Sequence, residues 1–376
     1  MPSSLATFPR NNSEPKSYSQ QLTVSDTERA EQQFIYLLTL DNLDNSLERR
    51  AADTSDFDAI LAAALTAAYA GEAGCDVAHR FLQRVLYRIN RLKLFWYDDL
   101  RRYDNERSAY LREIRDRIED GWQRWERAKI KIVELQKTDV RKALLERAAA
   151  DLAPEPSGDG RYFRDQVMET GYRRLLAIAS LDGLVEASQL SRTLGGVGNE
   201  IHSVLTRLLL EEYGGGNLNR KHSSFFTVML SELGMETAPE AYFDLVPWEV
   251  LAAINHSFLL SERKRYFLRY IGGLLYTEVS VPAAFGNYRA AASRLGLSPA
   301  AMGYWDLHIK EDERHGRWML HDIALPLADR YEADSWELLF GYDQQKLLSE
   351  RAGASIARAA REAEQGAQLT FKVGGR

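Results

Sequence analysis

The stretch His308-Ile-Lys-Glu-Asp312-Glu-Arg-His315 places two imidazoles and one carboxylate at positions i, i+4 and i+7. In an α-helix these positions lie on one face, on successive turns, so the three side chains project in the same direction. Imidazole nitrogen and carboxylate oxygen both suit iron as ligands. The spacing therefore predicts a helix that presents metal ligands to the interior of a helical protein.

The same stretch is also compatible with a solvated charged surface, because Lys310, Glu311, Glu313 and Arg314 surround the candidate ligands. With 54 acidic residues and 7 histidines in the chain, this spacing arises by chance in roughly one of fifty such sequences. The motif alone leaves both interpretations open. If the helix does carry a site, Glu311 and Glu313 point away from it, since each lies about 100° from Asp312 around the axis.

Residues upstream of this stretch supply matching chemistry. The run Glu211-Glu212-Tyr213-Gly214-Gly215-Gly216 leads into His222, and a second acid, Glu278, precedes Pro282. We interpret the glycines as a helix break that re-aims the histidine, because no following Lys-Ser/Thr pair or preceding strand indicates a phosphate loop. Four carboxylates carry a charge of about −4, which two ferrous ions would nearly cancel. The residues that can be lined up as one metal site are Glu186, Glu212, His222, Glu278, His308, Asp312 and His315.

In this order and context the chain resembles the haem-oxygenase-like di-iron oxidases, also described as iron-containing redox enzymes. Their pattern has a Glu on a first core helix, Glu-Tyr-Gly-x-Gly and a His on a second, and then a Glu and His-x3-Asp-x2-His. The resemblance covers about residues 155–345. It implies an all-α, haem-oxygenase-like helical bundle, in which carboxylates and histidines face inward. It also favours Glu212 over its neighbour Glu211, because the family's ligand directly precedes the Tyr-Gly pair.

The resemblance implies O2 activation at a non-haem centre of two iron ions, with O2 as co-substrate and an external electron donor such as a reductase. Three imidazoles are typical of the family's N-oxygenating members, whereas ferritin-like di-iron proteins have two. We therefore expect N-oxygenation of an amine or guanidine-type nitrogen of a small molecule in specialised metabolism. We expect no cupin domain after the bundle, although an N-oxygenating relative carries one.

Other functions remain open. The runner-up is oxidative C–C or C–H cleavage of a small acid or amino acid, which includes decarboxylation, desaturation and fragmentation. The same scaffold also holds haem through one histidine or works without a cofactor in some relatives. A third class is a non-catalytic helical protein whose acidic cluster merely binds metal.

The composition indicates which class of protein this is and which partners it lacks. The chain has 376 residues, of which 45% are hydrophobic, and a mean hydropathy of −0.38, as expected of a globular protein. A net charge of −6 gives no support for nucleic-acid binding. Cys75 is alone, which excludes a disulfide framework and fits a reducing cytoplasm. The polar first 25 residues do not resemble a signal peptide, and the apolar run 59–70 is too short to span a membrane.

The clearest boundary is the segment 151–161, which contains two prolines and two glycines. We expect a flexible arm (1–25), an N-terminal helical domain (26–150), this linker (151–161), the di-iron domain (162–364) and a tail (365–376). Between residues 76 and 147 there is no proline and only one glycine, Gly121, which predicts one or two long helices. Their apolar residues exceed what one helical pair buries against itself, so they would pack on the bundle or on another chain. We expect a homodimer through this domain.

Within the bundle the pattern predicts core helices at 163–193, 198–213, 218–235, 247–257, 264–293, 298–325 and 333–363. Aromatic residues crowd these segments, and most of them should pack in the core. We expect Phe225, Tyr276 and Trp305 to wall a substrate pocket, since an oxidising iron centre needs a largely dry cavity. The remaining histidines lack a matching partner set and are expected to be hydrogen-bonded structural residues: His79, His202, His256 and His321.

Overall fold

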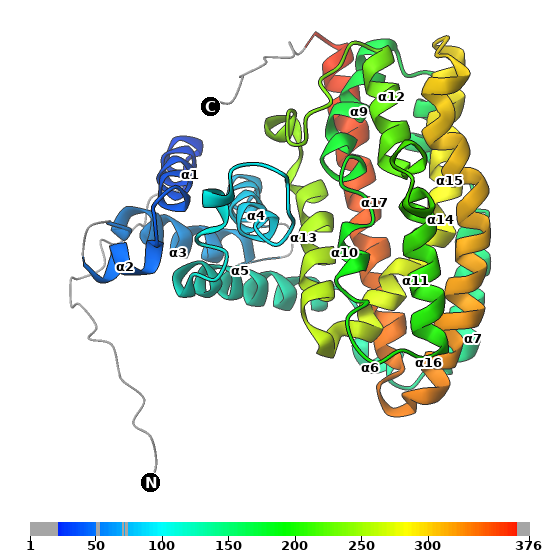
Figure 1. Ribbon diagram of the computed structural model, residues 1–376, viewed down its shortest axis with the longest axis horizontal. Coiled ribbons are helices and arrows are strands. Elements are labelled where there is room, and N and C mark those ends of the chain that lie inside the picture. Colours follow the sequence, from blue (N-terminus) through cyan, green and yellow to red (C-terminus); the bar gives the residue numbers. More distant parts are fainter. Residues whose placement is uncertain (1–21, 50–52, 70, 72–73, 367–376) are drawn as a thin grey trace.

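The computed structural model describes residues 22–49, 53–69, 71 and 74–366. All regular secondary structure in these ranges is helical, which confirms the predicted all-α class. Most of the predicted arm (1–25) and of the tail (365–376) lies outside the described residues. Figure 1 shows a group of short helices at one side of a bundle of longer, roughly parallel helices.

The N-terminal group has its own apolar core. The first helix begins with a capping box, in which the side chains of Thr23 and Asp26 each accept a hydrogen bond from the other residue's backbone N–H. It starts slightly before residue 26, where the N-terminal domain is expected to begin. The rings of Phe34 and Phe57 stack with their centroids 5.1 Å apart, and Trp122 is fully buried. The elements of this group are α1 (Val24–Leu38), α2 (Leu43–Glu48), α3 (Ser55–Tyr69), α4 (Asp76–Arg91), η1 (Leu100–Tyr103) and α5 (Ala109–Arg127).

Segment 76–147 is not one or two long helices, so that prediction is wrong. After α4 the chain turns at Tyr97, whose φ is 56°, and Ser108 caps the start of α5. The turn is held by Tyr103, whose hydroxyl accepts the Trp96 backbone N–H at 2.8 Å and donates to Asp98 at 2.7 Å. Side-chain bonding closes this turn without glycine or proline, and for that reason the periodicity gave no sign of it. Two more helices follow, α6 (Ile132–Leu135) and α7 (Val140–Leu152).

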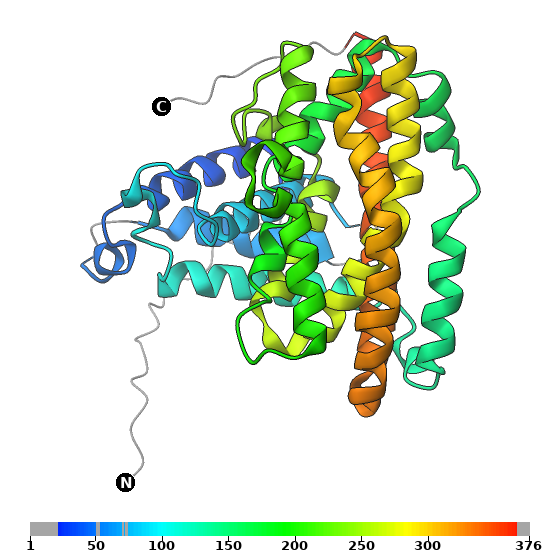
Figure 2. The same cartoon turned by 45° about the vertical axis from the view of Figure 1, so that its right-hand side comes forward.

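The bundle is built around two long helices, α14 (Phe267–Arg294) and α17 (Trp336–Glu364), which cross closely (Figure 2). The approach depends on Gly272 and Gly341, because a Cβ on either would collide with the backbone of the other helix. The remaining bundle helices are α8 (Gly158–Asp165), α9 (Glu169–Gly183), α10 (Ser188–Ser191), α11 (Glu200–Glu212), α12 (His222–Glu232), α13 (Trp248–Glu262), α15 (Pro299–Trp318) and α16 (Leu325–Arg330). Short 3-10 turns at 214–216, 218–220, 243–245, 264–266 and 332–334 and a π-helical turn at 319–324 connect some of them.

Two sequence expectations about the bundle need correction. The helix expected at 163–193 is instead three helices, α8, α9 and α10, and Glu186 lies in the turn between the last two. There Ala187 adopts a φ of 62°, so the chain bends directly after the glutamate. The helix expected at 247–257 continues to Glu262.

Helix α7 lies before the predicted linker but packs on the bundle. Leu144 is fully buried in the bundle core, and Arg147 forms a two-pronged ion pair with Asp343 of α17 at 2.7 and 2.9 Å. The linker thus joins two helices that both contact the bundle, and the division into domains stays a prediction.

The N-terminal group docks on the bundle through α4 and α13. Buried Asn255 donates to the backbone and side-chain oxygens of Gln83 at 3.0 and 2.9 Å, and accepts from Asn90 at 3.0 Å. Most apolar residues that prompted the dimer expectation are buried within the chain, whereas Phe95 is 55% exposed. Dimer formation stays a prediction, which sedimentation would test; a 42.8 kDa species at micromolar concentration would contradict it.

Candidate metal centre

The seven candidate ligands come from five segments of the bundle and meet in its interior. Glu212 is the last residue of α11 and His222 the first of α12, with the glycine turn between them. Gly214 is required in that turn, because its φ is 62° and a Cβ would collide with the backbone of Arg220. The predicted helix break is therefore confirmed. All seven side chains are buried except that of Glu186, which is half-buried.

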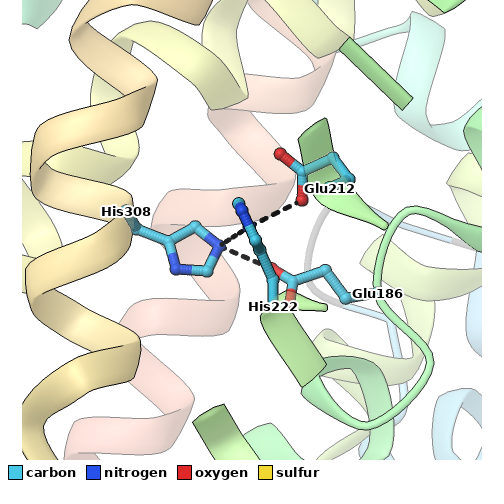
Figure 3. A group of neighbouring side chains, drawn as sticks. All are labelled: Glu186, Glu212, His222 and His308. Atoms are coloured by element: carbon cyan, nitrogen blue, oxygen red, sulfur yellow. Dashed lines mark hydrogen bonds and ion pairs between the residues drawn. The ribbon is translucent and has the colours of Figure 1, made fainter. Parts of the chain in front are cut away.

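The first ligand group consists of Glu186, Glu212, His222 and His308, whose donor atoms lie within 4.8 Å of one another (Figure 3). His308 Nε2 is 2.7 Å from Glu186 Oε1, and His222 Nδ1 is 2.8 Å from Glu212 Oε2. His222 Nδ1 and His308 Nε2 are 3.2 Å apart. His308 Nδ1 lies 2.8 Å from the carbonyl oxygen of Tyr304, so the hydrogen bond it donates leaves Nε2 facing the group.

The second ligand group surrounds His315 Nδ1. Three carboxylate oxygens lie around this nitrogen, from Glu278 at 3.4 Å, Glu212 at 3.5 Å and Asp312 at 3.6 Å. The other ring nitrogen, Nε2, is 3.0 Å from Glu211 Oε2. His315 therefore lies between three interior carboxylates, which face Nδ1, and Glu211, which faces Nε2.

Glu212 belongs to both groups. Its Oε2 faces His222 in the first group, while its Oε1 faces His315 in the second. One carboxylate that offers one oxygen to each of two adjacent ligand sets is the arrangement that bridges a pair of metal ions.

The donor set fits metal ions on an observation independent of any motif. Glu186 Oε2, Asp312 Oδ1 and His315 Nδ1 are buried and make no hydrogen bond. Buried polar atoms without a partner are costly, and buried carboxylates need a compensating positive charge. Mixed nitrogen and oxygen donors around these atoms suit iron.

Residues 173–345 match the model of a family described as iron-containing redox enzymes. A curated relative, the nitrosourea synthase of Streptomyces achromogenes subsp. streptozoticus, is 27% identical over 183 residues. That match covers 48% of this chain and 39% of the relative, so the chain spans well under half of the relative's length. The match to iron-containing redox enzymes agrees with the mixed nitrogen and oxygen donors of the two ligand groups. Among the described residues, no helix has the length and apolar character needed to cross a membrane.

The pKa shifts of the two ligand groups show which positive charges a metal would replace. Burial lowers the pKa of His308, but Glu186 and the other carboxylates outweigh it and raise the pKa to about 10. Burial likewise lowers the pKa of His315, but the nearby carboxylates of Asp312, Glu278 and Glu212 outweigh it and raise the pKa to about 11. Burial also raises the pKa of Glu278 to about 7. In the metal-free site, protons on the imidazoles compensate the carboxylates.

Iron binding should therefore release protons. Both imidazoles are protonated at pH 7 in the metal-free protein, and a protonated imidazole cannot bind a metal. The affinity for Fe(II) is expected to fall as the pH falls from 8 to 6, by up to about tenfold per pH unit for each proton displaced. Anaerobic competition against a coloured chelator at several pH values measures this slope, and an affinity independent of pH would contradict it.

Glu211 is placed to support the domain's metal ligands. Besides its contact with His315 Nε2, its carboxylate accepts from Arg314 at 2.5 Å. Glu313 pairs with Arg317 at 2.9 Å and lies outside every ligand group, as the helical spacing predicts. Glu311 pairs with Arg314 and lies outside the two groups that share Glu212, but its carboxylate gathers with Glu211 and His315 in a third group on the outer side of the imidazole. Glu211 is therefore no alternative to Glu212 as the shared ligand: Glu212 faces His315 Nδ1, and Glu211 faces His315 Nε2.

The other histidines differ in part from expectation. His79 and His256 are fully buried, and no ring nitrogen of either has a hydrogen-bond partner among the described residues, so the expected hydrogen bonds are absent. His79 instead stacks on Trp248 with a centroid distance of 4.3 Å. Burial lowers the pKa of His79 to about 4 and that of His256 to about 3, so both are neutral at pH 7. His202 and His321 belong to neither ligand group.

A cavity of about 430 Å³ adjoins both ligand groups of the iron-containing domain. Its wall includes five of the candidate ligands and is otherwise largely apolar and aromatic. Phe225, Tyr276 and Trp305 do not line it: Trp305 donates to the Tyr172 hydroxyl at 2.8 Å within the core, and the other two pack elsewhere. The aromatic residues on the wall are Tyr270, Phe285, Tyr288 and Tyr304.

Proposed function

We propose that this protein is a non-haem di-iron, O2-dependent oxygenase that oxidises an amine or guanidine-type nitrogen of a small molecule in specialised metabolism. The observation that carries the proposal is the pair of ligand groups that share Glu212 and open onto one cavity. Because there are two adjacent ligand groups, we expect each chain to bind two iron ions. When bound, iron would supply O2 activation, with electrons from an external donor such as a reductase.

The protein's own residues hold and orient this centre. Glu186, His222 and His308 would bind one ion, and Glu278, Asp312 and His315 the other, with Glu212 between them. The Tyr304 hydroxyl donates to Glu186 Oε1 at 3.1 Å, and its backbone carbonyl fixes the ring of His308. Tyr304 thereby orients two ligands from different segments. The apolar cavity wall limits water near the reacting atoms, which protects reactive species from side reactions.

Nitrogen as the oxidised atom has two supports. The site has three imidazoles, as the N-oxygenating members of the resembling family do. The curated relative is named for making a nitrosourea, a compound in which a nitrogen atom carries oxygen. Oxidative cleavage of a small acid is the alternative, but no Lys or Arg lines the described part of the cavity to pair with a carboxylate.

Anaerobic loading with Fe(II) tests the proposal. We expect about two irons per chain, oxygen uptake that depends on an amine or guanidine substrate, and a product whose added oxygen is bonded to nitrogen. Iron content, an oxygen electrode and mass spectrometry with ¹⁸O2 measure these. Formation of a stable haem complex, the absence of iron uptake, or a product cleaved at carbon would each contradict the proposal.

A further inference from the structure

The cavity contains an acidic side chain that neither ligand group uses. Asp182 lies in the last turn of α9, one helical turn before Glu186. Protein atoms surround it closely enough that burial is the largest cause of its raised pKa, while its side chain keeps exposed surface and borders the cavity. No described residue forms a hydrogen bond or ion pair with its carboxylate. An isolated buried carboxylate is costly, and burial followed by the charge of Glu186 raises the pKa of Asp182 to about 6.

Aromatic rings border the same cavity as this carboxylate. Tyr270, Phe285, Tyr288 and Tyr304 all border the cavity. Burial first, and then carboxylates that include Asp182, raise the pKa of Tyr270 and Tyr304, so these phenols stay neutral and Asp182 lies near both. A carboxylate flanked by aromatic rings is the environment that favours an organic cation, since the acid gives a charge-assisted hydrogen bond and ring faces attract positive charge.

Apart from the candidate metal ligands, the described cavity wall has no positively charged side chain that could pair with an anion. Its charged residues are Asp182 and the candidate ligands, and no Lys or Arg borders the described cavity. The remaining polar residues are uncharged: Gln189, Ser257, Thr277, Gln345 and Ser349. Apart from the candidate metal ligands, a substrate carboxylate here would meet the like charge of Asp182 and no cationic side chain among the described residues.

We propose that Asp182 binds the ammonium or guanidinium group of a substrate whose remaining body is largely apolar and carries no carboxylate. This inference rests on the proposed function and narrows it, because it assigns the substrate class and a specificity-determining residue outside the metal ligands. With Asp182 one turn from Glu186, the cation is held beside the iron site. The cavity volume lies within the range of roughly 300–1,000 Å³ that small-molecule pockets span.

Binding of four matched probes tests the inference: n-hexylamine, n-pentylguanidine, hexan-1-ol and hexanoate. Calorimetry with anaerobic, Fe(II)-loaded protein should show both cations binding about 10- to 100-fold more tightly than hexanol, as one charge-assisted bond allows. Hexanoate should bind most weakly. Equal binding of hexanoate and hexylamine would overturn the inference.

Variants assign the preference to Asp182. D182N should remove the preference for cations and change hexanol binding little, which also reports that the cavity is intact. D182E keeps the charge and should retain a preference for cations. The matched control is D322N, which removes the same charge at an exposed position of the π-helical turn outside the cavity. It should behave like the wild type. A D182N protein that still prefers cations would overturn the inference.

Failure of this inference and failure of the proposed function can be told apart. Probe binding requires no oxygen and no turnover. If cations bind through Asp182 but nitrogen is never oxidised, only the proposed function fails. If nitrogen is oxidised and D182N retains the wild-type KM and preference for cations, only the role of Asp182 fails.

Discussion

Glu212→Gln is expected to reduce bound iron from about two ions per chain to one or fewer and to lower O2-dependent turnover by at least about a thousandfold. The amide keeps the size of the side chain but has one weakly donating oxygen in place of two charged ones. It therefore cannot serve His222's group and His315's group together. Substitution of a residue that only hydrogen-bonds to a metal ligand typically lowers metal affinity or activity by roughly 10- to 100-fold. Substitution of a ligand shared by both ions should lower them further.

The neighbouring substitution Glu211→Gln is the matched control, since it makes the same chemical change one residue earlier. Glu211 contacts the outward nitrogen of His315 and two arginines, Arg314 and Arg207, and it belongs to neither group that contains Glu212. We expect this variant to retain two irons with an affinity weaker by about 10- to 100-fold at most. Metal analysis after anaerobic loading and dialysis, together with oxygen uptake, compares the two. If Glu211→Gln loses iron and Glu212→Gln keeps it, the assignment of the bridging residue is wrong.

The sequence revealed those parts of the site that depend on local geometry. His308, Asp312 and His315 share a face because of helical spacing alone, so their common direction follows wherever the helix lies. The glycine break before His222 was visible for a similar reason, since positive φ angles favour glycine. Glu186 was identified as a ligand candidate but was placed on a helix, because nothing in its neighbours signals that Ala187 turns the chain.

Features that depend on tertiary packing were not predictable. Tyr304 and Trp305 are adjacent and point in directions about 100° apart, and only the packing of α15 decides which one borders the cavity. The prediction of Trp305 as a cavity residue is wrong, since Tyr304 borders the cavity and orients two ligands. Asp182 gave no signal at all, because an acid on an otherwise ordinary helix becomes notable only when the space in front of it is known.

The contact between α14 and α17 is a second feature that the pattern did not reveal, and it yields the largest expected effect on stability. Gly272 packs against the carbonyl of Leu338, and Gly341 packs against Arg269, so each glycine fits where the other helix's backbone passes. A methyl group at Gly272 has no flexible neighbour to displace, because the obstructing atoms belong to the backbone. The helices must separate.

Gly272→Ala is therefore expected to destabilise the protein by about 3 kcal/mol or more, at the upper end of what overpacking costs. The control is Gly286→Ala in the same helix, where a Cβ meets no atom within 4 Å. That change should be neutral or stabilise by about 0.5–1 kcal/mol, because alanine favours the helix interior. Thermal unfolding of the metal-free proteins measures both.

The same pair of variants links the packing to the metal centre. Glu278 lies on α14 between Gly272 and Gly286, less than two turns after Gly272. A displaced α14 moves this carboxylate away from His315 Nδ1, so Gly272→Ala should also weaken iron binding in the fraction that remains folded, while Gly286→Ala should keep both ions. A Gly272→Ala protein with wild-type stability and iron content would show that the helix contact tolerates a side chain and that it does not position the ligand.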